Sequence, residues 1–230
     1  HRPFRAPHHS VSATALSGGG SFPRPGEVSL AHNGVLFLDE LPEFPRDALE
    51  ILRQPLEDGT VTISRVSGSA RFPCRFMLVA AMNPCPCGYY GHPTRQCTCT
   101  RYAIDRYLQK VSGPLLDRID LHVEVMPVEY EALASSRAGE SSAAILKRVA
   151  AARARQQQRY AGTGIACNAY LPSAMLRSAC RLTPEAGRML KSVFEAMGLS
   201  ARAYDRVLKV SRTIADLEGA EVISAAHVSE

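Results

Sequence analysis

The sequence lacks any long hydrophobic stretch. None of its apolar runs approaches the roughly 18 residues that span a bilayer, and its first residues are not a charged stub followed by an apolar segment, as in a secretory signal. We therefore expect a soluble protein without a membrane partner. The chain begins with His1 instead of an initiator methionine, so we also expect it to be a fragment of a longer protein.

A glycine-rich phosphate-binding loop is also missing. The pattern Gly-x-x-x-x-Gly-Lys-Ser/Thr occurs nowhere, and the nearest glycine run, residues 18–20, has no lysine after it. Such a loop supplies backbone N–H groups and a lysine that hold the β- and γ-phosphates of a nucleotide. The 230 residues therefore lack this part of a nucleotide site.

The number of cysteines and the net charge limit which cellular compartment and which binding partners are expected. Seven cysteines are an odd number, and four of them form two Cys-x-Cys pairs. This pattern argues against a secreted disulfide framework and for a reducing compartment, so we expect the cytoplasm. The formal net charge of +5 is compatible with a nucleotide or nucleic-acid partner but is too small to establish one.

The segment Gly34–Leu41 is the stretch around which the other motifs are placed. Its apolar run is typical of an interior strand of a parallel sheet, and ligands of open α/β sheets bind at the carboxyl ends of such strands. At that end Asp39 is suited to hold Mg²⁺ through its water shell, and Glu40 to polarise a water that attacks a γ-phosphate. The plainer interpretation, two solvated loop carboxylates, stays open on these eight residues alone.

A second apolar run, residues 76–82, is also typical of a buried strand, and it ends in Asn83-Pro84. On a strand beside the first, Asn83 would hold the attacking water and touch the γ-phosphate. Asparagine also favours the position before proline for turn reasons. Taken alone, Asn83 is better explained as a residue that ends a strand.

Four thiols lie close together in the sequence, with nine residues between the two pairs: Cys85, Cys87, Cys97 and Cys99. They have the ligand count of a structural zinc site, and zinc favours soft thiolates. Zinc loops usually space each pair by two or more residues, so reduced or redox-sensitive thiols remain an equal alternative. The other cysteines are predicted to be small buried hydrophobes: Cys74, Cys167 and Cys180.

Arg118 precedes an alternating segment, residues 121–125, which is typical of an edge or half-buried strand. From that position an arginine can project from a domain edge and reach the γ-phosphate of a neighbouring subunit. The alternative is an ion pair within the chain, with Asp117 or Asp120, and the local sequence by itself favours it.

The amino-terminal 20 residues are predicted to be extended and loop-like because of their prolines and glycines. We interpret His8 and His9 as surface histidines, since adjacent side chains of an extended segment point in opposite directions. Residues 21–33 are interpreted as a short insertion before the central strand.

A helix and a hairpin are predicted between the two strands. Leucines at helical spacing predict a helix over residues 47–56 that ends at Pro55. Residues 60–64 alternate and residues 70–73 return, so we predict a hairpin with its turn at residues 67–69.

Small polar residues at 132–143 mark a predicted domain boundary, after which strand signals stop. The first helix beyond it carries basic residues that are commoner on a solvated face than on a nucleic-acid surface. Thr183-Pro184 and Gly198 bound a further helix, and another is predicted from about residue 203 to 217, with Val207, Val210, Ile214 and Leu217 inward.

Together these segments resemble the magnesium-chelatase-like AAA+ ATPases, and most closely the ComM/YifB family of bacterial competence proteins. The similarity covers nearly all of the chain, and its length and order make coincidence a poor explanation. It rests on Arg2-Pro3-Phe4-Arg5-Ala6-Pro7-His8-His9, Asn33–Leu41, Asn83-Pro84-Cys85-Pro86-Cys87-Gly88, Gly113–Asp120 and Gly198–Arg206.

The resemblance implies an α/β fold in which a partial AAA+ P-loop NTPase parallel sheet, residues 1–135, is followed by an all-helical lid domain, residues 136–230. It implies an insertion near residues 18–33 and a hairpin near residues 60–73 that faces the pore of a homo-hexameric ring. The implied cofactors are ATP and Mg²⁺.

It also implies roles for single residues. Asp39 and Glu40 are the Walker B pair, and Asn83 is sensor 1. Arg118 is the arginine finger, and Arg202 is the sensor 2 arginine on a lid helix.

For function, the resemblance implies the carboxyl-terminal part of an ATPase motor that couples hydrolysis to DNA remodelling or branch migration. In the family the phosphate-binding loop lies upstream, with a Lon-protease-like domain, so we expect the fragment alone neither to bind ATP tightly nor to hydrolyse it. Two alternatives remain: a chelatase-type motor subunit that acts on a protein partner, and a zinc-stabilised, non-catalytic DNA- or protein-binding module.

Overall fold

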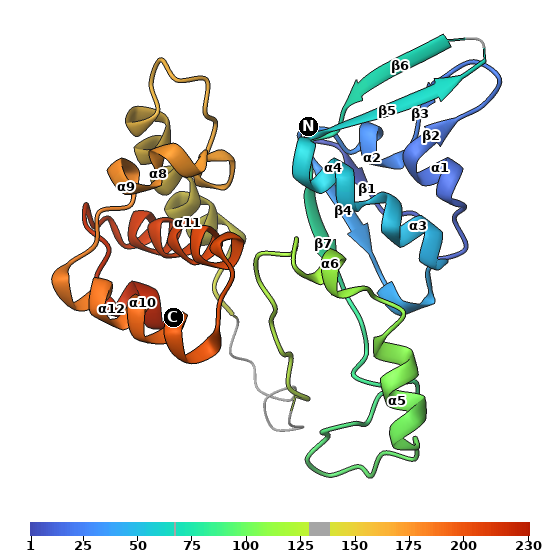
Figure 1. Ribbon diagram of the computed structural model, residues 1–230. Helices are drawn as coiled ribbons and strands as arrows, with labels where there is room; N and C mark the ends of the chain where they lie inside the picture. The colour runs from blue at the N-terminus through green and yellow to red at the C-terminus, as the bar shows by residue number, and fades with distance from the viewer. Residues whose placement is uncertain (67, 129–138) are drawn as a thin grey trace. The chain divides into compact units, whose positions relative to one another are not determined.

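The computed structural model describes residues 1–66, 68–128 and 139–230. The chain divides into two compact units, residues 1–128 and 129–230. The first contains every strand of the named sheets and the second is helical, as Figure 1 shows, so the predicted order of an α/β part and a helical part is confirmed. The boundary predicted at residue 135 lies outside the described residues.

A three-stranded parallel sheet is the framework of the first unit. Its order is β1 (Phe4–Arg5), β4 (Val35–Leu38) and β7 (Met77–Ala80), so β4 is central. Both predicted strands are therefore confirmed as parallel neighbours, but the burial predicted for residues 76–82 is wrong: β7 is the last strand of the described sheet, and Met77 and Val79 are 64% and 40% exposed. Leu36 and Leu38 of β4 are completely buried, as expected for the interior strand of a sheet.

The opening segment is more ordered than predicted. Phe4 and Arg5 form β1, and α1 (Ala13–Ser17) begins where the Ser12 side chain accepts the N–H of Ala15. The loop-like interpretation is wrong for these residues, because Arg5 makes a two-fold contact that local sequence does not reveal. Its guanidinium donates at 2.6 and 2.7 Å to the carboxylate of Glu27, at the start of α2 (Glu27–Leu30).

The insertion before β4 consists of a short antiparallel ribbon, β2 (Gly18–Gly19) with β3 (Arg24–Pro25), followed by α2. The longer hairpin pairs β5 (Thr60–Arg65) with β6 (Gly68–Pro73). It confirms the predicted hairpin, although pairing continues to its tip, where Arg65 lies opposite Gly68. The predicted turn is thus too long, and its first residue, Ser67, lies outside the described residues.

The helix predicted over residues 47–56 is two helices, α3 (Arg46–Ile51) and α4 (Arg53–Asp58). The predicted end at Pro55 is wrong, because this proline lies in the first turn of α4. A first-turn residue needs no intrahelical N–H donor, so proline costs nothing there. The helix ends instead at Gly59, in the left-handed conformation with φ of 64°.

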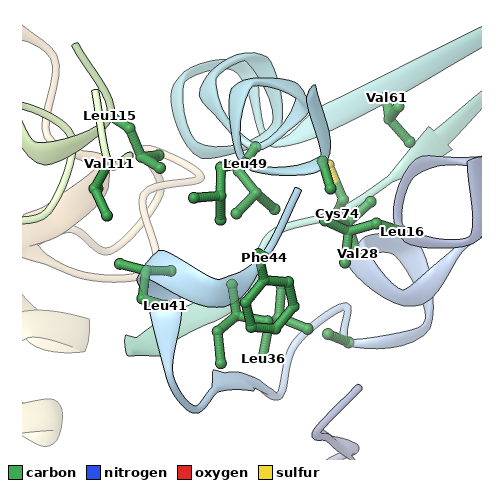
Figure 2. Close-up of a cluster of buried hydrophobic side chains, with 14 residues drawn as sticks. Leu16, Val28, Leu36, Leu41, Phe44, Leu49, Val61, Cys74, Val111 and Leu115 are labelled. Carbon is green, nitrogen blue, oxygen red and sulfur yellow. The ribbon is translucent and has the colours of Figure 1, made fainter. Parts of the chain in front are cut away.

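One apolar core joins these elements. Figure 2 shows side chains from α1, β4, the α3–α4 pair and the 3₁₀ turn η1 (Leu41–Glu43) gathered against one another. Leu16, Leu36 and Leu49 are almost completely buried in it, and Cys74 is buried as predicted. Leu41, Phe44 and Ala48, which follow Asp39 and Glu40 in the sequence, also belong to this core. The core therefore holds the chain in place just after the end of β4.

After β7 come α5 (Arg101–Leu108), α6 (Gly113–Leu116) and an irregular segment. The strand predicted over residues 121–125 is wrong: the structure gives no regular element there, and Val123 and Val125 are 80% and 85% exposed. An alternating segment becomes a strand only when a sheet edge pairs with it. Within the described ranges no strand pairs with this one.

The second unit is built from helices, with the bounds α8 (Ser142–Arg159), η2 (Asn168–Tyr170), α9 (Ser173–Ala179), α10 (Pro184–Met197), α11 (Ala201–Glu218) and α12 (Ala225–Ser229). The predicted bounds of α10 at Thr183 and Gly198 are confirmed, and both Gly198 and Gly219, which ends α11, are in the left-handed conformation. Among the described helices of both units, none combines the length and the apolar character needed to cross a membrane.

The inward face predicted for α11 is wrong in part. Leu217 is exposed, and the buried positions include Leu208, Ala215 and two charged residues, Arg212 and Asp216. These two are an i, i+4 pair with Nη2 and Oδ1 3.1 Å apart. A hydrophobic pattern assigns charged residues to the surface, so it rotates the predicted face away from the ion pair.

Candidate functional site

The two acids predicted as a catalytic pair lie at the carboxyl end of β4. The ladder with β7 continues past the last paired residues, since the N–H of Ala81 donates to Leu38 at 2.9 Å and the N–H of Leu41 donates to Ala81 at 2.9 Å. Asp39 and Glu40 therefore project from the edge of the parallel sheet where ligands of such sheets bind. Both residues are exposed, and thus accessible to a ligand.

Glu40 has an unusual backbone. Its φ of 53° and ψ of 46° place it in the left-handed region, which is uncommon for residues other than glycine, asparagine and aspartate. The Asp39 carboxylate accepts the N–H of Glu40 at 2.9 Å, and the buried Leu41 and Pro42 follow at once. Such strain persists where the surroundings enforce it, and it is concentrated at functional sites.

His9 lies against Glu40, with 3.0 Å between Nδ1 and Oε2. Its ring is also 4.0 Å from the ring of His8, centroid to centroid, so the two side chains do not point in opposite directions as predicted. The prediction is wrong because the chain is not extended there: it turns at residues 9–10, and the N–H of Val11 donates to the backbone carbonyl of His8 at 2.9 Å. His9 is a site residue that local sequence reasoning missed.

Asn83 follows β7 and is exposed at the same edge of the sheet. Beside it lies Tyr107 of α5, which is only 6% exposed. Burial raises the pKa of Tyr107, the carboxylates of Glu43 and Glu40 raise it further, and a backbone hydrogen bond with Asn83 acts in the opposite direction. Tyr107 thus links the residue that follows β7 to α5, and the sequence offered no signal for it beyond helical spacing.

Arg118 pairs within its own unit, but with neither of the predicted aspartates. Its guanidinium forms an ion pair with Glu57 of α4, and Nε lies 3.2 Å from the Glu57 carboxylate. Nη1 donates to the carbonyl of Pro114 at 2.6 Å. The side chain is 14% exposed, so in this structure α4 and α6 hold it down. Its role as a finger stays a prediction.

Arg202 lies in the second unit, in the first turn of α11, which Ser200 caps by accepting the N–H of Ala203. It is exposed. Its role as sensor 2 also stays a prediction.

The four predicted thiols are brought together between β7 and α5. All four Sγ atoms lie within 4.8 Å of one another: Cys85, Cys87, Cys97 and Cys99. The pKa of Cys87 is lowered to about 5 because the backbone N–H groups of Tyr89 and Thr98 donate to it. The pKa of Cys97 responds in the opposite direction. The backbone N–H of Cys99 donates to Cys97 and lowers its pKa, but burial and the neighbouring thiols outweigh this effect and raise the pKa to about 12. The cluster has the donor set of a metal site.

The same sequence matches two family models over almost its full length. Residues 1–133 match the model for magnesium chelatase, subunit ChlI, and residues 139–230 match the model for the carboxyl-terminal part of that subunit. Together they cover both structural units.

Individual relatives agree with this match. Over its whole length, the chain is 50% identical to the competence protein ComM of Haemophilus influenzae and 49% identical to the uncharacterized protein YifB of Escherichia coli K12. It is 46% identical, over 94% of its length, to the uncharacterized protein Rv2897c of Mycobacterium tuberculosis. It spans only 43–44% of these relatives.

Proposed function

Since this chain belongs to the magnesium chelatase subunit ChlI family, we propose that the intact protein is an AAA+ ATPase that couples ATP hydrolysis to the remodelling of DNA, including branch migration. One observation carries the proposal. The acid pair Asp39-Glu40, with Glu40 in a left-handed backbone conformation, follows the central strand β4, next to the end of β7 that leads to Asn83. It supports the proposal because hydrolysis of a nucleoside triphosphate needs an acid that holds Mg²⁺ and groups that position the attacking water.

The chain's own groups have distinct tasks in this proposal. Asp39 would hold Mg²⁺ through coordinated water, and Glu40 would accept a proton from the attacking water, which Asn83 orients. Bound Mg²⁺ supplies charge neutralisation at the β- and γ-phosphates. These acids fit that cofactor because both are exposed at the ligand-binding edge of the sheet. The loop that cradles the phosphates is not among the 230 residues.

DNA is the proposed substrate because of the 50% identity to a protein named for competence, and the net charge of +5 is compatible with it. We further propose a homo-hexamer in the cytoplasm, in which Arg118 acts on the neighbouring subunit's nucleotide and Arg202 contacts nucleotide in its own. To do so, the Arg118 guanidinium would have to leave its ion pair with Glu57 and bind the phosphate instead. A guanidinium can make this change because carboxylate and phosphate present similar pairs of oxygen atoms.

The test is ATP turnover by the intact protein, with and without DNA, for Glu40→Gln. Removal of a general base lowers turnover by a factor on the order of 100 or more, whereas ATP binding should persist because Asp39 remains. Glu43→Gln is the matched control: it removes another partly exposed carboxylate from the next turn, one that pairs with Lys110 at 3.1 Å. Turnover unchanged by Glu40→Gln would refute the assignment.

The thiol cluster favours a second candidate function, a zinc-stabilised module that binds DNA or protein without catalysis. DNA binding that needs no nucleotide, in an intact protein without ATPase activity, would support it. A third reading, a motor subunit that drives a metal-inserting partner, fits the family name. Stimulation of turnover by such a partner and not by DNA would distinguish it from the first.

A further inference from the structure

We propose that Cys85, Cys87, Cys97 and Cys99 bind one Zn²⁺ ion as four thiolates, and that this ion holds the segment between β7 and α5 in place. The inference is independent of ATP hydrolysis, because none of the four thiols is among the acids, the asparagine or the arginines assigned to that chemistry.

The separations of the sulfur atoms support tetrahedral coordination. Zinc–sulfur bonds of about 2.3 Å at tetrahedral angles place sulfur atoms about 3.8 Å apart. The Sγ atom of Cys97 lies 3.7 Å from that of Cys85 and 3.5 Å from that of Cys87, and the Cys85–Cys87 distance is 3.4 Å. A disulfide needs about 2.05 Å, and all four of these cysteines are free thiols.

The backbone around the thiols is arranged to favour thiolates. The N–H of Tyr90 donates to Sγ of Cys85 at 3.3 Å, and the N–H of Cys99 donates to Sγ of Cys97 at 3.4 Å. Gly88, with φ of 81°, reverses the chain directly after the first pair of cysteines, where its N–H donates to the backbone carbonyl of Cys85 at 3.0 Å. This reversal lets a Cys-x-Cys pair direct both sulfur atoms to one point despite its short spacing.

The histidine within the loop is engaged elsewhere. Nδ1 of His92 accepts the N–H of Thr94 at 3.2 Å and that of Arg95 at 3.1 Å. A set of four sulfur ligands therefore describes the site without His92. Four thiolates are the ligand type that selects zinc over magnesium or calcium.

The segment also needs an internal link, because it has almost no core. Residues 81–100 contain no helix or strand, and Cys85 is the one buried residue among them, all of which the structure describes. Loops this long without regular structure are uncommon in compact domains, and small units that cannot bury enough apolar surface are commonly held by metals or disulfides. A zinc ion bound to the cluster provides such a link.

The position of the cluster defines what the ion would hold. Cys85 follows Asn83 by two residues, and Cys99 immediately precedes Thr100, whose side chain caps α5 by accepting the N–H of Ala103 at 3.2 Å. Zinc at this point would connect the end of β7 to the start of α5. The ion is therefore structural, because all four of its positions are filled by protein ligands.

The first experiment measures zinc per chain in the purified protein. We expect one zinc ion, with loss of at least 90% of it in Cys97→Ser and Cys99→Ser. Cys167→Ser is the matched control, because it removes a partly buried thiol of the second unit, and it should retain one ion. One iron ion in place of zinc, or full zinc retention in the cluster variants, would overturn the proposal.

Two measurements on the unmodified sequence guard against variants that fail to fold. Cobalt(II) added to zinc-free protein should saturate at one ion per chain, with the intense sulfur-to-metal absorption of a four-thiolate site. Trypsin should cleave after Arg95 at least ten times faster once a chelator has removed the zinc, and returning zinc should restore protection. Absence of the cobalt absorption, or cleavage that zinc does not affect, would overturn the inference.

Discussion

The strongest prediction for stability concerns Asp216 in the helical unit. Its carboxylate is completely buried and accepts hydrogen bonds from Arg159 of α8 at 2.9 Å and from Asn168 of η2 at 2.9 Å. Arg212, one turn earlier on α11, lies 3.1 Å away and is 1% exposed on its side chain. One carboxylate thus ties three elements together, and Asp216→Ala would leave a buried guanidinium without its counter-charge.

The expected loss of stability in Asp216→Ala depends on which hydrogen-bond partners Arg159 and Arg212 keep. Breaking a buried ion pair by removing one partner costs about 3–5 kcal/mol. Arg212 keeps the carbonyls of Ala220 and Glu221, the latter at 2.7 Å, and Arg159 can turn toward solvent because its side chain is 24% exposed. We therefore expect the free energy of unfolding to fall by about 3 kcal/mol, the low end of that range. This corresponds to a fall of roughly 10–20 °C in the unfolding temperature of this unit.

Hydrogen exchange is the suitable assay, because it reports on each unit separately. In Asp216→Ala, protection of amides in α8 and α11 should fall by a factor on the order of 100, as about 3 kcal/mol requires. Amides of β4 in the first unit are the internal reference. Glu195→Ala is the matched control: it removes an exposed carboxylate 3.8 Å from Lys191, and such pairs contribute at most about 1 kcal/mol. Equal effects of the two variants would refute the reasoning.

Two further predictions concern pH and backbone packing. Burial opposes ionisation of Asp216, but the hydrogen bond from Arg159 and the other partners outweigh it, so the pKa of Asp216 is lowered in the folded state. The contribution of Asp216 to the stability of this unit should therefore be complete above the unfolded carboxyl pKa of about 4. It should be lost as pH falls through the lower pKa of the folded state. The protection factors of amides in α11, which correct the exchange rates for the intrinsic effect of pH, should therefore fall as the pH drops below about 4, and Asp216→Asn should remove this part of the pH dependence. Gly34→Ala should destabilise the first unit by about 2 kcal/mol, because its Cβ would lie 1.9 Å from the carbonyl oxygen of Pro3 and separate β1 from β4. Gly187→Ala, in α10 with open space at its Cβ, should instead stabilise the second unit by about 0.5–1 kcal/mol; urea unfolding of both variants, read by exchange in each unit, checks the contrast.

The elements that sequence predicted well are those whose signal is local. The apolar run around residue 36 is continuous because β4 lies inside a parallel sheet, and Thr183 and Gly198 bound α10 by cap chemistry that involves only neighbouring residues. The edge of the sheet that carries Asp39 and Glu40 could therefore be placed before any coordinates. So could the close approach of the four cysteines, because a short loop connects them.

The features that sequence missed depend on partners far apart in the chain. Arg118 pairs with Glu57, 61 residues away, and local reasoning offered only its nearest aspartates. The segment at residues 121–125 alternates like a strand, yet pairing is a property of its neighbours and not of its own pattern. Charged residues in the core, such as Arg212, cannot be identified from hydrophobicity, because burial becomes affordable only once a second helix supplies hydrogen bonds.

The contacts around Tyr107 connect the two chemistries proposed for the first unit. Its buried side chain shares a backbone hydrogen bond with Asn83, and its pKa responds to Glu40, Glu43 and Cys85. The backbone of Asn83 is thus hydrogen-bonded to Tyr107, and Asn83 lies two residues before the first cysteine of the thiol cluster. A loop with a single buried residue cannot by itself hold an asparagine in a fixed orientation. If four thiolates bind zinc there, the ion stabilises the position of Asn83 relative to Glu40, so loss of zinc should impair turnover while leaving the acids unchanged.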